Sequence, residues 1–175
     1  MSRDEMYHLV LARLGEGPTF DHCIATERCM AALARRFGED AELWGLTGLV
    51  HDMDLDACEP DLSNHTLIAK HVLERIGAPR EMITAVLAHN DKAPRTTLLD
   101  KALWVTDPTT GMITATSLVL PSRNVADVQV TSVKKRMKDK RFAAAVNRDQ
   151  IRACETELVI PLDEFLELCI KAMAM

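Results

Sequence analysis

The sequence predicts an all-α protein, and two observations support this fold class. Apolar residues recur at spacings of three and four positions along most of the 175-residue chain, as in helices that bury one face. We find no repeated alternation of apolar and polar residues of the kind that half-buried strands require. The length predicts one domain, over residues 1–175, that buries a core without needing disulfide bonds.

Caps and turns mark the first two predicted helices. Residues 2–5, Ser-Arg-Asp-Glu, match a capping box, and Gly-Glu-Gly-Pro at residues 15–18 should end the helix that follows it. Thr19 is expected to cap the second helix. The apolar stripe of that helix includes His22, which is therefore expected to face the interior.

A third helix, over about residues 39–51, is apolar on nearly all sides. Such a helix is expected to be buried and central. It delivers His51 and Asp52 to the interior, and the acids that follow indicate that the helix ends there. Two neighbouring residues can reach one ion only at such a helix end or beside a cavity, because side chains diverge by about 100° per helical residue.

The next two predicted helices each place one histidine inward. Asn64 is a plausible cap for a helix over residues 64–76, in which His65 lies on the apolar face and His71 on the polar face. A helix then runs to His89, which closes another apolar stripe.

A further helix begins near Thr97 and carries Asp107 on its apolar face. Pro108 is expected to kink or end it, although residues 111–120 could resume it. Residues 121–130 read as a connection, and the last helix starts at Pro161. Between them, the C-terminal helices over about residues 131–175 are expected to pack on the preceding core.

Composition excludes some functional classes. The formal net charge of −5 argues against general nucleic-acid binding, because a phosphate backbone requires a basic footprint. One basic run, residues 134–141, is either a solvated helix face or a wall that attracts phosphate beside a site. Five scattered cysteines favour a reducing, cytoplasmic environment, and the sequence offers neither a signal peptide nor a membrane span.

Six polar side chains are thus predicted to share the interior. Burying carboxylates and imidazoles costs several kcal/mol unless something neutralises them. One or two divalent metal ions would do so, and Mn, Fe, Ni, Co, Zn and Mg all remain open. The predicted ligands are His22, His51, Asp52, His65, His89 and Asp107.

This order, H…HD…H…H…D on successive helices, resembles the HD-domain superfamily of metal-dependent phosphohydrolases over roughly residues 19–120. The resemblance is strongest to its small prokaryotic predicted hydrolases, and it implies an HD-type helical bundle with the metal site in its core. It assigns His22, His51, Asp52 and Asp107 to a first ion. It matches His65 and His89 to the additional histidines of family members that bind two metal ions.

Two named activities fit the sequence poorly. The branch that hydrolyses the guanosine alarmone carries H-D-x-x-E-D, whereas Leu55 occupies the position of its glutamate. The cyclic-dinucleotide branch carries a double histidine and a Gly-Tyr-Pro sequence, whereas Asn90 follows His89 and no such sequence occurs.

The resemblance implies hydrolysis of a small phosphate ester or nucleotide by metal-activated water. Asp52 would bridge two ions, and Asp54, taken to be an exposed loop acid like Asp56, could act as a general acid or base. Cations that could bind the anionic substrate are Lys92, Arg95 and, more weakly, Lys101. Two alternatives remain open: a di-iron oxygenase, since inositol oxygenase and its relatives use the same ligand set, and a metal-binding regulatory module without turnover.

Overall fold

Helices account for all the regular structure in the computed structural model, which describes residues 2–175. No strand occurs in this range, and the predicted all-α class is confirmed. The elements are α1 Arg3–Leu14, α2 Pro18–Phe37, α3 Ala41–Val50, α4 Leu55–Cys58, the 3-10 turn η1 Leu62–Asn64, α5 Leu67–Arg75, α6 Arg80–His89, α7 Leu98–Leu118, the 3-10 turn η2 Val125–Asp127, α8 Val130–Met137, α9 Arg148–Arg152, α10 Cys154–Glu157 and α11 Leu162–Met173.

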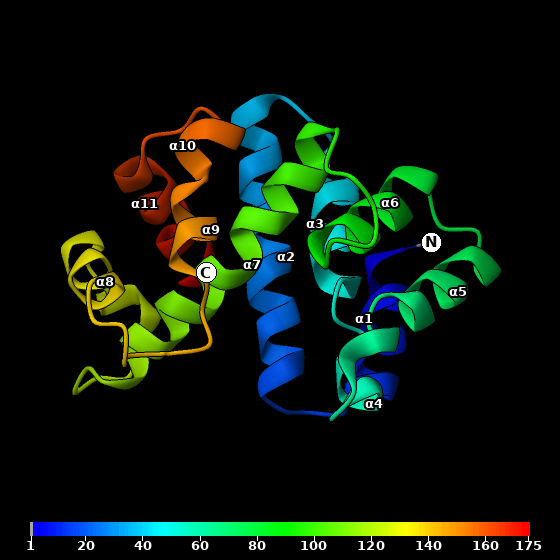
Figure 1. The fold of residues 1–175 in the computed structure, drawn as a ribbon, viewed down its shortest axis with the longest axis horizontal. Coiled ribbons are helices and arrows are strands. Elements are labelled where there is room, and N and C mark those ends of the chain that lie inside the picture. Colours follow the sequence, from blue (N-terminus) through cyan, green and yellow to red (C-terminus); the bar gives the residue numbers. More distant parts are fainter. Residues whose placement is uncertain (1) are drawn as a thin grey trace.

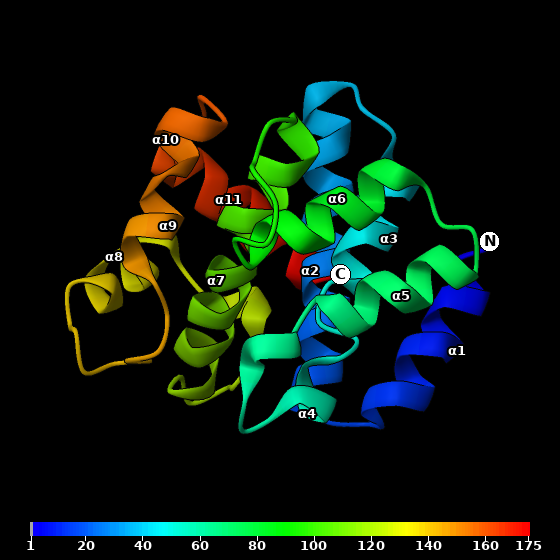
Figure 2. The same cartoon turned by 45° about the vertical axis from the view of Figure 1, so that its right-hand side comes forward.

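Helix α2 stands between two groups of helices, as Figures 1 and 2 both show. On one side α1, α3, α5 and α6 enclose an apolar cluster that includes Val10, Leu49 and Leu73. On the other side α7, α8, α9, α10 and α11 enclose a second cluster that includes Leu103 and Phe165. Helix α2 packs against both α3 and α7, so the helices that carry or precede His22, His51 and Asp107 are neighbours.

Two of the predicted helix starts are confirmed by complete capping boxes. The Ser2 hydroxyl accepts from the Glu5 amide, and the Glu5 carboxylate accepts from the Ser2 amide. Thr97 and Asp100 exchange the same pair of bonds at the start of α7. Both patterns satisfy amide groups that the first helical turn leaves without a partner.

Two other predicted caps are wrong. Helix α2 begins at Pro18 after Gly17, and the Thr19 hydroxyl instead donates to Asp56 Oδ1 at 2.8 Å. Proline at the first helical position needs no cap for its missing N–H. Asn64 lies at the end of η1, so α5 starts three residues later than predicted, after Thr66.

Helix α7 continues through Pro108 and does not end there, so the predicted alternative of a stop is wrong and that of a kink stays a prediction. Proline lacks an N–H, so the carbonyl four residues earlier, on Trp104, loses its helical partner. The Gln150 side chain donates to this carbonyl from Nε2 at 2.5 Å. This tertiary hydrogen bond replaces the missing one and keeps Asp107 within a helix.

Helices α2 and α3 approach closely at Gly48. A Cβ atom built at this position would lie 2.8 Å from the Thr26 carbonyl oxygen. Only glycine therefore fits here, and this contact fixes the end of α3 against α2.

The basic run lies in the C-terminal part and is divided between α8 and the segment after it. Helix α8 includes residues 134–137 and ends there, so residues 138–141 follow outside it. Lys134 pairs with Asp163 at 2.5 Å, and the Arg136 guanidinium lies 4.8 Å from the centre of the Phe142 ring.

All five cysteines are buried and free. Over residues 2–175, none of the helices combines the length and the apolar character needed to cross a membrane.

Candidate metal centre

The structure brings the six predicted ligands together from five segments of the chain. One nitrogen or oxygen of each lies within 4.8 Å of the corresponding atoms in its group. There are two such groups within the described residues, and Asp52 belongs to both. The first group is His22, His51, Asp52 and Asp107, and the second is Asp52, His65 and His89.

The end of α3 explains how neighbouring residues reach the same centre. The helix stops at Val50, and residues 51–54 form a turn. His51 has no exposed surface and Asp52 retains only 6%. The turn releases the Asp52 side chain from the helical divergence that would otherwise separate it from His51.

The first group is a compact set of nitrogen and oxygen atoms. His22 Nε2 lies 3.1 Å from His51 Nε2 and 3.1 Å from Asp107 Oδ1. Asp52 Oδ2 lies 3.6 Å from His22 Nε2 and 3.3 Å from His51 Nε2. Atoms bonded at about 2 Å to a common ion are separated by such distances.

The second group uses the other oxygen of the shared carboxylate. Asp52 Oδ1 lies 3.3 Å from His65 Nε2 and 3.3 Å from His89 Nε2. Each oxygen of Asp52 therefore faces its own pair of imidazoles. A carboxylate in this position can bridge two metal ions.

In two of the histidines, Nδ1 faces a backbone carbonyl oxygen, which determines the nitrogen that carries the proton. His51 Nδ1 lies 2.8 Å from the Gly48 carbonyl oxygen, and His89 Nδ1 lies 2.6 Å from that of Val86. A carbonyl only accepts, so each Nδ1 carries the proton and donates it. In the neutral imidazole, Nε2 then presents its lone pair to the centre.

The other two histidines, His65 and His22, are oriented in the same way by contacts between Nδ1 and neighbouring side chains. His65 Nδ1 lies 2.8 Å from Asp54 Oδ1, a carboxylate that accepts its proton. The Thr110 hydroxyl donates to the Asp107 carbonyl at 2.8 Å and lies 3.1 Å from His22 Nδ1, from which it can accept. All four imidazoles thus have the orientation that metal-binding histidines adopt.

The charged groups of the centre favour a positive charge bound among them. The pKa of Asp52 lies well below its usual value: burial opposes this shift, but the charge and hydrogen bond of His51 outweigh it. Burial lowers the pKa of His65, yet hydrogen bonds to Asp52 and Asp54 raise it to about 9. Divalent ions fit these donors because histidine nitrogens and carboxylate oxygens suit them.

Asp54 is not an exposed loop acid, so that prediction is wrong. It is fully buried, with Oδ1 held by His65 and Oδ2 accepting from the Ala69 amide at 2.8 Å. Its carboxylate orients His65 and the start of α5, and its role as a general acid or base stays a prediction. Asp56, by contrast, is exposed as predicted.

The three cations predicted to bind substrate are each held by a protein partner. Lys92 Nζ donates to the Ser63 carbonyl at 2.7 Å. Arg95 pairs with Asp91, donates to the Ala88 carbonyl and lies 4.2 Å from the centre of the Trp104 ring. Lys101 pairs with Glu157 at 3.2 Å. Substrate binding by these three residues stays a prediction.

Access to the centre is uneven. The side chains of His22 and Asp107 are 21% and 29% exposed, whereas those of His51, Asp52 and His89 are at most 9% exposed. The exposed edge of the first group therefore lies along α2 and α7.

Sequence reasoning missed Thr110 and the two carbonyl acceptors. Thr110 lies three residues after Asp107 on the same helix, and Gly48 and Val86 lie three residues before their histidines. A histidine that ends a buried helix can bond the carbonyl one turn earlier, and this spacing was the available signal.

Two comparisons with known proteins bear on the family of this chain. The family model for the HD domain matches residues 19–145, well over half of the chain. Over 82 residues the chain is 30% identical to Ribonuclease Y of Cutibacterium acnes, an alignment that spans 46% of this chain and 15% of that protein. The chain thus covers only a small part of that relative. The extent of the family match shows that this chain belongs to the HD-domain family.

Proposed function

We propose that the protein is a metal-dependent phosphohydrolase that acts on a small phosphate ester or nucleotide. The observation that carries the proposal is the position of Asp52, whose two oxygens each face a separate pair of imidazole Nε2 atoms at 3.3–3.6 Å. Such an arrangement suits two adjacent cations held by one carboxylate. Paired ions are a common device for displacement at phosphorus.

The residues present fit this role, and each has a distinct task. Bound divalent ions would lower the pKa of a coordinated water molecule and polarise a phosphoryl group. Asp52 would hold both ions, while His22, His51 and Asp107 complete one site and His65 and His89 the other. The exposed edge at His22 and Asp107 would admit the phosphoryl group, and the buried histidines would keep bulk water away from the rest of the centre.

A small substrate fits better than a polymer. The name Ribonuclease Y describes an RNA-cleaving enzyme, and RNA cleavage is also chemistry at a phosphate ester. The net charge of −5, however, argues against the general electrostatic attraction that binding of a long phosphate backbone requires. We therefore limit the proposal to small phosphate esters and nucleotides.

The test is a phosphoesterase panel run on metal-free protein with Mn²⁺, Co²⁺, Ni²⁺, Mg²⁺ or Zn²⁺ added, without oxygen. We expect metal-dependent release of phosphate or nucleoside from at least one substrate, and loss of that activity in Asp52→Ala. His71→Gln, a change at a side chain that is 74% exposed, should keep full activity. Iron-dependent consumption of dioxygen without phosphoester hydrolysis would contradict the proposal, as would metal binding with no turnover of any kind.

A further inference from the structure

Among the four imidazoles of the metal centre, His22 is the most exposed and the one whose Nδ1 faces a hydroxyl group. Carbonyl or carboxylate oxygens face the Nδ1 atoms of His51, His65 and His89, and such oxygens accept a proton without offering one. A hydroxyl can either accept or donate. The nitrogen of His22 that carries the proton therefore depends on where the Thr110 hydroxyl directs its own proton.

The Thr110 hydroxyl has an acceptor on its own helix. It lies 2.8 Å from the Asp107 carbonyl oxygen, three residues earlier, and 3.1 Å from His22 Nδ1. Because the carbonyl only accepts, the proton of Thr110 is directed there, and the two lone pairs of the hydroxyl remain. One lone pair can accept the Nδ1 proton of His22, which leaves Nε2 free to bind an ion. A single side chain thus links two predicted ligands that belong to different helices.

Hydrogen bonds from threonine to a carbonyl of the preceding turn are common in helices, and α7 contains others. Thr109 donates to the Val105 carbonyl at 2.6 Å, and Thr116 donates to the Met112 carbonyl at 2.8 Å. All three threonines are fully buried, but Thr110 differs from the other two because its hydroxyl also faces α2. The contact with the histidine is therefore an addition to an ordinary helical hydrogen bond.

Helix α2 supplies a partner for the second lone pair. The Thr26 hydroxyl, one turn after His22, lies 3.4 Å from the Thr110 hydroxyl, and Thr26 is fully buried. Since the proton of Thr110 is directed to the Asp107 carbonyl, Thr26 is the donor in this contact. The Thr110 hydroxyl then uses its one proton and both of its lone pairs, which is its full hydrogen-bonding capacity.

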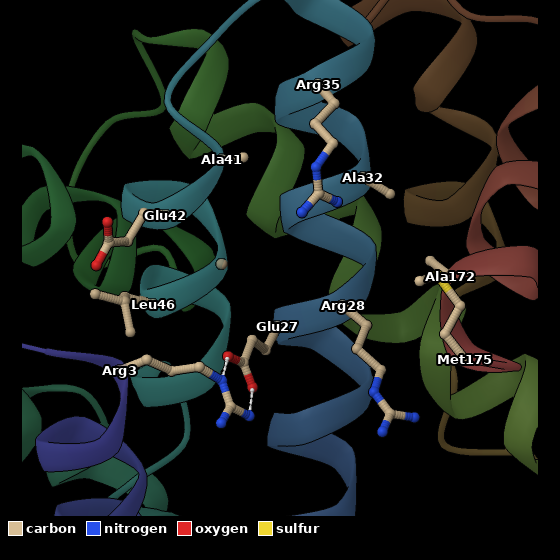
Figure 3. A pocket seen from close by; sticks show the side chains of 11 residues that line it. Arg3, Glu27, Arg28, Ala32, Arg35, Ala41, Glu42, Leu46, Ala172 and Met175 are labelled. Atoms are coloured by element: carbon tan, nitrogen blue, oxygen red, sulfur yellow. Dashed lines mark hydrogen bonds and ion pairs between the residues drawn. The ribbon is translucent and has the colours of Figure 1, made fainter.

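Neighbouring helices hold α2 in place at Thr26. A Cβ atom at Gly48 would lie 2.8 Å from the Thr26 carbonyl oxygen, so α3 lies directly against α2 at this point. Arg3 of α1 binds the carboxylate of the next residue, Glu27, through bonds at 2.5 and 2.9 Å, as Figure 3 shows. Thr26 therefore lies where two other helices fix α2, and it gives Thr110 a firmly placed partner.

We propose that Thr110 is a positioning residue of the metal centre: its hydroxyl, held by Thr26, orients His22 so that Nε2 binds the first ion. The inference rests on the metal-binding part of the proposed function and not on the hydrolysis reaction. Without the hydroxyl, the Nδ1 proton of an ion-bound His22 loses its acceptor. The second group of ligands does not include the two residues that Thr110 contacts, apart from α2, so its affinity for an ion should be unchanged.

The test is calorimetric titration of Zn²⁺ into metal-free, full-length chains that carry His65→Ala and His89→Ala, so that the first group of ligands is measured by itself. On this background Thr110→Val removes the hydroxyl and should weaken Zn²⁺ binding about 10–100-fold. Thr110→Ser keeps a hydroxyl and should restore the affinity of the background chain. Thr109→Val is the matched control: it changes the neighbouring, equally buried threonine, whose hydroxyl donates to a carbonyl away from the histidines, and should leave the affinity unchanged.

A second measurement needs no variant. Nitrogen-15 NMR spectra of the unchanged chain loaded with Zn²⁺ should show His22 coordinated through Nε2 and protonated at Nδ1. Coordination through Nδ1 would overturn the proposal.

Three outcomes of the titrations would also overturn it: unchanged affinity in a folded Thr110→Val chain, a loss that Thr110→Ser does not restore, or an equal loss in Thr109→Val. A cooperative thermal transition of each metal-free variant shows that it is folded. Hydrolysis does not enter these measurements, so their result stands whether or not the chain turns over a phosphate ester.

Discussion

Replacing Asp54 with Asn should weaken one of the two metal sites and spare the other. The Asp54 carboxylate accepts from His65 Nδ1 and from the Ala69 amide, each at 2.8 Å, and has no exposed surface. Asn offers only one oxygen, so its NH₂ group must face one of these two donors. If it faces His65, the imidazole loses its acceptor, and the tautomer with Nε2–H then points a proton at Asp52.

The magnitude follows from the loss of one buried, charge-assisted hydrogen bond. Removing the acceptor that orients a metal-binding histidine typically costs about 10–100-fold in metal affinity, or about 1.4–2.7 kcal/mol. We expect a loss in this range at the site that contains His65 and His89. The site that contains His22, His51 and Asp107 has no contact with Asp54 and should retain its affinity.

The assay is calorimetric titration of metal-free protein with Mn²⁺ or Zn²⁺, which resolves two binding events when their affinities differ. Asp56→Asn is the matched control, because Asp56 is exposed and accepts from Thr19, away from the histidines. A cooperative thermal transition in the metal-free Asp54→Asn chain would show that the variant is folded. If the folded variant binds both ions with unchanged affinity, the proposed role of Asp54 in orienting His65 is refuted.

Three further outcomes follow from the structure. Gln150→Ala leaves the carbonyl freed by Pro108 without a donor and should lower the free energy of unfolding by about 1–3 kcal/mol in denaturant titration; an unchanged value would contradict this. Gly48→Ala places a Cβ 2.8 Å from the Thr26 carbonyl oxygen and should destabilise by at least about 1–3 kcal/mol, so a stable variant would disprove the close contact. The folded pKa of His65, about 9, exceeds its ordinary 6.5, so this residue stabilises the metal-free chain most below pH 6.5. Melting temperatures of that chain should fall between pH 6.5 and 9, and a rise would contradict the shift.

Most helices could be predicted because caps and apolar periodicity depend on residues that are close together in the sequence. The helix after Ser2 starts as its capping box indicates, another starts at Thr97 as predicted, and His65 faces inward and His71 outward as the apolar stripes indicate. The errors arise where a distant residue decides the outcome. Pro108 stays within α7 because Gln150, more than forty positions away, donates to the freed carbonyl.

The same distinction, between local patterns and contacts with distant residues, applies to the metal centre. Inward register was enough to select His22 and Asp107 as ligand candidates, because register on a buried helix fixes direction. It could not reveal that Asp54 is buried, since the turn after α3 and the start of α5 together enclose it. Nor could it show that the Arg95 guanidinium lies on Trp104, a contact between a loop and a helix.

Metal stoichiometry of the full chain tests most directly whether Asp52 joins two sites. Metal-free protein titrated with Mn²⁺ or Zn²⁺ should bind two ions per chain, measured by calorimetry and checked by elemental analysis. The His65→Ala, His89→Ala double variant should bind one, and Asp52→Ala should lose both. One ion per chain at saturation, unchanged in the double variant, would contradict the two-site arrangement and leave His65 and His89 as groups that contact the substrate.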